Sequence, residues 1–456
     1  MLISDYAAAR HLASRLEIGV DDDLSRQRVG QSVDAVFQSM LPPAGYMPPE
    51  PNLTPWEQVG IFYTSPIEMQ RDIMDQARMD GDGLTAWWLE QLHKAPYPLL
   101  ERMTLFWHNH FTSDIDKVTW PQFMYRQNQL LRKHALGNFA ELLHEIAKDP
   151  AMLVFLDGSR NVAKSPNENF ARELLELFTL GVGHYSEEDI INVARAFSGW
   201  GVNLPAGSFV FKEKQHDNDE KSFLGRKANL DGADILNILL QEPRTAEYIA
   251  EKFWAEFINH DTPDPIVIKV WGNAFRDSGY EVTALLKAII HSQVFWEPRQ
   301  RGTLIKSPVE FGIGLLRELK LSLTDYGALR IANQQLGQDL FRPPDVKGWR
   351  GGKDWINNTR LIRRYDLIPK LLAEHTGDIR NMLVESIIEP KLAVGSKQSQ
   401  ARGLFKSVLE RFSCHTNTMA LANWLLPINP VAMPDCNQPM EKILQVLLKD
   451  PTYQLR

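Results

Sequence analysis

The chain has 456 residues and a formal net charge of −7, because 57 acidic residues outnumber 50 basic ones. This balance argues against a generic nucleic-acid binder, which would carry a basic excess. Apolar residues make up 44% and charged residues 23% of the chain, which suits a globular protein with a buried core. The length allows about three domains of roughly 150 residues, or one large domain. No apolar run approaches about 18 residues, so no transmembrane helix is expected.

Two cysteines, Cys414 and Cys436, exclude a disulfide scaffold and an all-cysteine metal site. Either they form one disulfide in an exported protein, or they remain separate thiols. The first residues lack a basic stretch followed by an apolar core, and so they do not form a signal peptide. Either the chain stays in the cytoplasm or a leader has been removed, and both locations stay open.

Apolar residues recur at three- and four-residue spacing along most of the chain, which predicts a mostly α fold built as a multi-helix globular body. Long alternating patterns, typical of strands, are absent. Helices are expected over residues 57–75, 83–94, 97–111, 121–147, 166–180, 187–198, 231–258, 266–292, 307–320, 359–374, 402–424 and 440–449.

Two short runs, 209–211 and 222–224, are the best strand candidates because they are rich in aromatic and apolar residues. They predict a small β-hairpin-like insertion near 208–224, or an ordered loop.

Two irregular segments interrupt the helical pattern. Residues 41–55 are proline-rich, which prevents a helix and favours extended chain. Residues 336–358 are rich in Gly, Pro and Trp. From these breaks we expect an N-terminal helical segment with a proline-rich linker, a main helical domain and a C-terminal helical region, at residues 1–56, 57–375 and 376–456.

The segment that follows Lys164 carries the signals of a buried helix. Ser165 is expected to cap a helix over 166–180, Glu168 to complete a capping box, and Gly181 to end the helix in the left-handed conformation. The apolar residues between them form a wide stripe that predicts burial.

The polar residues of this helix allow two interpretations. In the functional one, Glu168 and Glu173 supply carboxylates as base or ligand, Arg172 binds an anion, and Asn167 contacts the ligand. In the structural one, Glu168 only caps and Arg172 only pairs.

The run Trp107-His108-Asn109-His110 holds two histidines two positions apart. On a strand such a pair can bind one metal ion, whereas on a helix the two rings lie about 200° apart. The pair therefore works only if the helix predicted over 97–107 ends at or before His108. The alternative is a neutral histidine bonded in the core.

A polar group of residues lies between the two strand candidates. His216, Asp217 and Asp219 could bind a divalent ion, or His216 and Asp217 could move a proton, with Lys221 as an anion binder. The alternative is a solvated hairpin tip.

The stretch from Arg342 to Trp355 combines glycines with aromatic and basic residues. Gly348 allows backbone close to a ligand, Trp349 could stack on a flat ligand, and Lys347 could meet an anion. The pattern is no P-loop. The alternative is a rigid loop that closes a core.

Together these stretches resemble the bacterial domain-of-unknown-function 1800 family over residues 40–375. The resemblance implies a mostly helical protein without an established activity. It also implies frequent export and genes that neighbour a sulfatase-like family, domain of unknown function 1501. No catalytic residue carries over from it. The matching motifs are FWHNHF (106–111), RKHALGNF (132–139), KDPAML (148–153), NENFARELLELFTLG (167–181), ARAFSGW (194–200), HD (216–217), Lys221, LG (224–225), GQ (337–338), PPDVKGW (343–349) and GG (351–352).

Two functions follow as hypotheses. The first is an enzyme, a hydrolase or oxidase of a glycan-like or sulfated substrate, in which a divalent metal could assist. Its single cleft would gather Glu168 or Glu173, one of the histidines at 108 and 110, and His216. The second is a non-catalytic binding or maturation partner of a sulfatase-like protein. The candidate residues are Glu168, Glu173, Arg172 and Lys221 for catalysis, Trp107, Asn167, Lys347 and Trp349 for ligand binding, and His108, His110, His216 and Asp217 for a metal.

Overall fold

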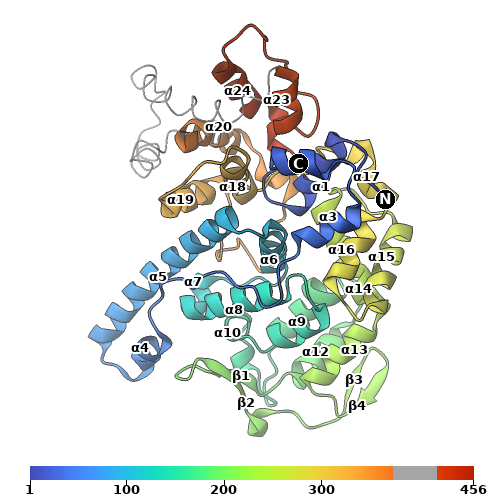
Figure 1. Cartoon of the computed structure of the whole chain (residues 1–456). Helices are drawn as coiled ribbons and strands as arrows, with labels where there is room; N and C mark the ends of the chain where they lie inside the picture. Colours follow the sequence, from blue (N-terminus) through green and yellow to red (C-terminus); the bar gives the residue numbers. More distant parts are fainter. Residues whose placement is uncertain (373–417) are drawn as a thin grey trace.

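The structure, a computed structural model, describes residues 1–372 and 418–456. It is mostly α-helical, as the periodicity predicts (Figure 1). The helices up to residue 200 are α1 (Tyr6–Leu16), α2 (Asp22–Arg28), α3 (Val33–Met40), α4 (Trp56–Gly60), η1 (Ile61–Thr64), α5 (Ile67–Lys94), α6 (Pro98–His110), α7 (Ile115–Val118), α8 (Pro121–His134), α9 (Phe139–Ile146), α10 (Pro150–Phe155), η2 (Gly158–Arg160), α11 (Asn169–Glu173), the π-helix η3 (Leu174–Thr179) and α12 (Glu187–Ala196).

The helical pattern continues after a small insertion that contains strands. The later helices are η4 (Glu213–Gln215), α13 (Gly232–Gln241), α14 (Pro243–Phe257), α15 (Pro265–Asp277), α16 (Val282–Ile290), α17 (Gln293–Trp296), η5 (Pro298–Gln300), α18 (Pro308–Glu318), α19 (Tyr326–Leu336), η6 (Gly352–Trp355), α20 (Asn358–Leu372), α23 (Thr418–Leu425), α24 (Met440–Leu448) and η8 (Pro451–Gln454).

The insertion consists of two antiparallel hairpins, β1 (Trp200–Asn203) with β2 (Ser208–Phe211), and β3 (Lys221–Phe223) with β4 (Arg226–Ala228). The predicted hairpin-like insertion is confirmed, but its two strand candidates pair with other strands rather than with each other. Leu224 and Gly225 have φ of 46° and 77°. Such a two-residue turn fits the right-handed twist of its strands, and so β3 pairs with the next strand.

Local breakers divide several of the predicted helices. The range 121–147 is split near Gly137, and 231–258 is split at Pro243, which opens α14 at its first position. In the opposite sense, α5 runs unbroken through Gly81, where two helices were expected. A Cβ on Gly81 would lie 3.0 Å from Cδ1 of Ile115, so the glycine admits a close neighbour.

Two apolar cores hold the helices together. One combines the N-terminal helices with α6, α9 and α13 to α16, and contains Leu12, Phe37 and Trp107. The other joins α5, α18, α19 and α20 to the C-terminal helices, and contains Trp88 and Trp424. Helices from both ends of the chain therefore share cores with the central region.

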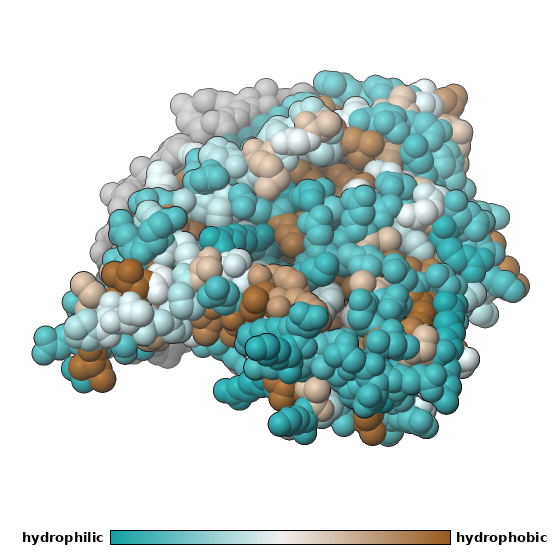
Figure 2. Space-filling model, turned by 90° about the horizontal axis from the view of Figure 1, so that it is seen from below, coloured by the Kyte–Doolittle hydropathy of each residue, from teal (hydrophilic) through white to brown (hydrophobic). Residues whose placement is uncertain are grey.

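The surface seen from below is mainly hydrophilic, with apolar residues in small separate areas (Figure 2). Within the described residues, no helix combines the length and the apolar character needed to cross a membrane. Cys436 is exposed, while Cys414 and much of the predicted helix 402–424 lie outside the described residues.

Candidate functional site

A cavity of about 400 Å³ opens between α6, α14 and the loop that precedes η6. It brings together segments more than 200 positions apart in the sequence. Its lining consists of Arg102, Leu105, Phe106, Asn109, His110, Leu177, Lys252, Ala255, Glu256, His260, Ile305, Ser307, Glu310, Gln338, Val346, Lys347, Trp349, Arg350, Gly351, Trp355 and Arg456.

The last turn of α6 supplies one wall. Pro98 begins this helix at a position that suits proline, and the helix runs on to His110. The Nε2 atom of His110 lies 3.2 Å from the carbonyl oxygen of Phe178. Burial lowers the pKa of His110 to about 3, so its ring is neutral at pH 7.

The opposite wall is a loop fastened to the same helix. Asn109 accepts a hydrogen bond from the backbone N–H of Trp349 at 2.8 Å and donates one to its carbonyl at 3.1 Å. Gly348 has a φ of 73°, and a Cβ there would lie 2.3 Å from Oδ1 of Asn109. Only a glycine at this position lets the loop approach α6 so closely.

The segment that carries the helix motif begins differently from its prediction. α11 starts at Asn169, and Glu168 forms no side-chain cap. Ser165 is exposed and forms an isolated backbone bridge with Val162, so the predicted Ser165 cap is wrong. Oδ1 of Asn167 instead accepts from the backbone N–H of Asn169 at 2.9 Å. A local asparagine turn therefore occupies the place that a capping box would need.

α11 continues directly into the π-helix η3, which ends at Thr179. Gly181 follows with a φ of 81°, in the left-handed conformation predicted for it. The hydroxyl of Tyr248 donates to the carbonyls of Glu176 and Leu177 at 3.2 and 3.1 Å. π-Helical turns are rare in proteins, and those that occur are often found at functional sites. Here the wide turn is held by a side chain from α14, and it presents Leu177 to the cavity.

Four charged side chains form the floor of the cavity. Nη1 of Arg102 lies 2.8 Å from both Glu256 and Glu310. Arg456 approaches the same two carboxylates, at 2.8 Å from Glu256 and 2.9 Å from Glu310. Burial favours the neutral form of Glu310, but the charges of Arg456 and Arg102 lower its pKa below the usual value, so this carboxylate stays ionised.

The lining of the cavity as a whole is more basic than the rest of the chain. Five Lys and Arg residues and two Glu residues line the cavity, in a chain whose net charge is −7. Lys252 and Arg350 form no ion pair with any described residue, and Lys347 has only Glu176, at 3.4 Å. Burial lowers the pKa of Lys252.

The predicted carboxylates lie outside this cavity. Arg172 pairs with Glu168 at 3.3 Å and with Glu187 at 2.9 Å, as the structural interpretation expects. Glu173 is half-buried, and burial, together with the charge of Glu176, raises its pKa.

Two further predicted site residues lie in the core. His108 is 1% exposed, and its Nε2 accepts from the backbone N–H of Phe341 at 3.2 Å. Burial lowers the pKa of His108 to about 3. Trp107 is 0% exposed, and its indole N–H donates to the carbonyl of Ala135. Neither side chain lines the cavity.

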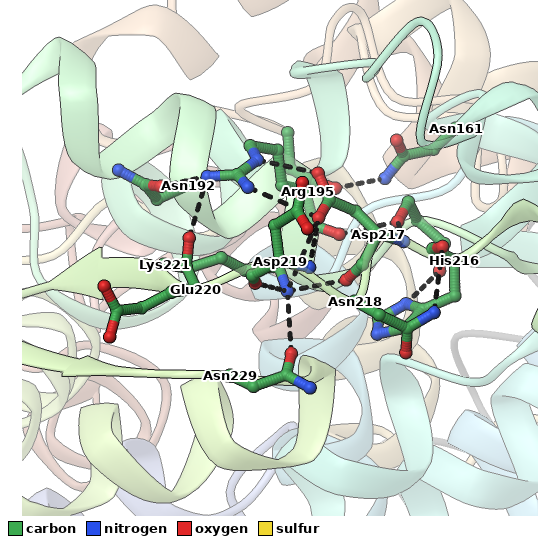
Figure 3. A network of polar contacts seen from close by, with 12 residues as sticks. Asn161, Asn192, Arg195, His216, Asp217, Asn218, Asp219, Glu220, Lys221 and Asn229 are labelled. Atoms are coloured by element: carbon green, nitrogen blue, oxygen red, sulfur yellow. Dashed lines mark hydrogen bonds and ion pairs between the residues drawn. The ribbon is translucent and has the colours of Figure 1, made fainter.

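The polar residues near β3 form a separate network (Figure 3). Asp217 binds Arg195 at 2.7 Å, so its carboxylate already has a cation. The buried ammonium of Lys221 donates to the backbone carbonyls of Asp217 and Asp219, at 2.6 and 2.9 Å, and to Asn229 at 3.3 Å. These contacts hold the loop in place instead of leaving Lys221 open to an anion.

His216 belongs to this network, with Nδ1 at 2.8 Å from the carbonyl of Ser198. Residues 1–372 and 418–456 contain no group of three or more His, Cys, Asp or Glu side chains placed to hold a metal ion. Of the predicted site residues, the structure brings His110, Lys347 and Trp349 to the cavity. The others lie outside its lining, and all of them except Glu173 form hydrogen bonds or ion pairs described above. His108 and His110 meet different surroundings because the helix runs through both.

Over residues 11–455 the sequence matches the family described as a protein of unknown function, DUF1800. The chain belongs to this family. The match extends beyond residues 40–375 at both ends, and so takes in α1 and the C-terminal helices. No curated protein and no solved structure matches the chain.

In this DUF1800 protein, the sequence interpretation missed most of the charged residues of the cavity. Arg102 follows the apolar residues that open α6, and Glu310 lies in a capping box with Ser307 at the start of the buried helix α18. A charge on the apolar side of a buried helix needs a partner. That rule could have identified Arg102 and Glu310 as charges in need of partners. The sequence around them, however, gives no sign that Arg456 is one of those partners.

Proposed function

We propose that this DUF1800 protein is a non-catalytic binding protein whose cavity takes an anionic, hydroxyl-rich ligand of the sulfated or carboxylated saccharide class. The observation that carries the proposal is the excess of basic residues around the cavity, five against two. In a chain of net charge −7, this excess favours a negative ligand at this place.

The rim supplies the charge. Lys252 and Arg350 have no carboxylate partner among the described residues, so an anion would not need to displace one. The ammonium of Lys252 is half-buried beside the ring of Tyr248, at 4.9 Å from the ring centroid. An ion pair gains strength where water is partly excluded. Arg350 adds a planar donor set that suits sulfate or carboxylate oxygens.

The floor suits hydroxyl groups. Arg102 and Arg456 offer donors, and Glu256 and Glu310 offer acceptors, in alternation. A sugar hydroxyl both donates and accepts, and so can use both kinds of partner.

The proposal is tested with a sulfated galactose oligosaccharide and its desulfated form, by titration calorimetry at two salt concentrations. We expect the sulfated probe to bind and the double variant K252Q/R350Q to bind it at least about tenfold more weakly, since two charge-assisted contacts are lost. The control K227Q/R160Q removes two exposed charges outside the cavity and should bind normally. Equal binding of both probes, or an unaffected K252Q/R350Q, would refute the proposal.

An enzyme acting on the same ligand is a second candidate, favoured by His260. Its imidazole lines the cavity beside the floor, and burial lowers its pKa, so the neutral ring can accept a proton. The test is release of sulfate or of new reducing ends from the probe. H260Q should abolish turnover and leave probe affinity unchanged. No turnover by the wild-type protein would eliminate this candidate.

A sulfatase-like partner and export follow from the family resemblance, and both fit a sulfated ligand. The partner proposal predicts co-elution of the purified chain with the product of the neighbouring sulfatase-like gene in size-exclusion chromatography. Export predicts the chain in the periplasmic fraction of its host. Separate elution, or retention in the cytoplasm, would exclude the respective proposal.

A further inference from the structure

Arg15 is fully buried without enough acceptors, and its charge interacts with those of the floor residues Arg102 and Arg456. Its side chain is 0% exposed, and Nη2 donates to the carbonyl of Gln300 and, at 2.8 Å, to Oγ1 of Thr303. Its Nε and Nη1 atoms have no hydrogen-bond acceptor among the described residues. An unmade hydrogen bond on a buried charged group is costly, so these donors point to a partner that the chain itself does not supply.

A second guanidinium in this region has the same property. Arg456 is 7% exposed, and its Nη2 donates to Glu256. Its Nε lies 2.9 Å from Glu310 as an ion pair, but neither Nε nor Nη1 has a hydrogen-bond acceptor in the described part of the chain. Arg102 pairs with the same two glutamates. Two of the three buried guanidinium groups pair with these carboxylates, and Arg15 interacts with them only through its charge.

The electrostatic setting agrees with this geometry. Burial, followed by the charges of Arg456 and Arg102, lowers the pKa of Arg15 well below its usual value. Burial, followed by the charge of Arg15, lowers the pKa of the neighbouring His11 well below its usual value, so its ring stays neutral. An arginine keeps its proton in a protein, so the positive charge has to be met by a negative partner.

We propose that a small monovalent inorganic anion, of the halide class, binds between Arg15 and Arg456. The free N–H groups of both residues would donate to it. Glu256 and Glu310 disfavour a multivalent anion so close to their carboxylates. Arg456 lines the cavity, which gives the ion an entry route. This site goes beyond the proposed saccharide function, because it completes the floor whatever ligand the cavity holds.

The first experiment compares the melting temperature of the wild-type protein in chloride and in gluconate at equal ionic strength. We expect a saturable increase of a few degrees in chloride, because an anion bound only by the folded state stabilises it. R15M should lose this response. R28M, which removes a buried arginine paired with Glu17, should keep it, as should K252Q/R350Q.

The second experiment needs no variant, and so holds if R15M fails to fold. Crystals grown in bromide should show an anomalous peak between the guanidinium groups of Arg15 and Arg456. Equal melting temperatures in chloride and gluconate, or a water molecule without anomalous signal at this place, would overturn the anion site. Neither outcome affects saccharide binding at the rim, so the two proposals fail separately.

Discussion

Asn109 and Trp349 hold each other through two hydrogen bonds, although they lie 240 positions apart in the sequence. The side-chain amide of Asn109 pairs with both backbone groups of Trp349, as a strand partner would. Thr112, three residues further along, donates from its hydroxyl to the carbonyl of Val346 at 2.5 Å. The end of α6 therefore determines where the cavity loop lies.

Replacing Asn109 by alanine should loosen this loop. We expect N109A to lower the free energy of unfolding by about 1–3 kcal/mol, because both backbone partners lose their bonds. Affinity for the sulfated probe should fall as well, since Lys347 and Arg350 belong to the same loop. Chemical denaturation and calorimetry measure the two effects, with the exposed N437A as control. Unchanged stability and unchanged affinity would show that the two bonds do not hold the loop.

The buried histidines of α6 should make the protein sensitive to acid. The pKa values of His108 and His110 fall from 6.5 to about 3 on folding, so between these values the unfolded state binds protons that the folded state does not. Stability is then lost as the pH falls below about 6.5, by up to about 1.4 kcal/mol per pH unit for each ring.

H108Q keeps an acceptor near the backbone N–H of Phe341 and removes the titration. We expect it to flatten the dependence of unfolding free energy on pH between about pH 6 and pH 4 relative to the wild-type protein. The exposed H184Q serves as the control. An unchanged slope in H108Q would mean that His108 titrates alike in both states.

Lys221 should act as a structural residue. K221M removes three donated hydrogen bonds and leaves two backbone carbonyls short of a partner, so it should destabilise the protein by about 2–4 kcal/mol. The exposed K214M should change stability by less than about 0.5 kcal/mol. Denaturant-induced unfolding of both variants measures these changes in the free energy of unfolding. A stable K221M with altered probe binding would favour the anion-binding role instead.

Ser186 and Ser165 should respond differently to replacement by alanine. Ser186 forms a complete capping box with Asp189 at the start of α12, whereas Ser165 caps nothing. S186A should therefore cost about 1 kcal/mol, and S165A should be neutral within about 0.5 kcal/mol. Thermal melts of the pair measure the difference. A larger loss in S165A than in S186A would contradict the observed start of α11.

Sequence patterns predicted the structure best for features that depend on the residues of a single helix. The wide apolar stripe from Phe170 to Phe178 predicted burial, and Gly181 predicted the left-handed end of the helix. The cap at Ser165 failed because Asn167 offers its own backbone turn, and a capping signal does not say which of two competing local bonds will form.

The sequence by itself determined that this protein is a mostly helical member of its family, because helical periodicity and ordered motifs are properties of neighbouring residues. Only the tertiary structure decided the site. In the folded chain Trp107 and His108 are buried, and Asp217 forms an ion pair with Arg195. One cavity is lined by four charged residues from distant segments, Arg102, Glu256, Glu310 and Arg456. The physical reason is that a charged side chain can find its partner anywhere in the folded chain, and pairing across hundreds of positions leaves no trace in local spacing.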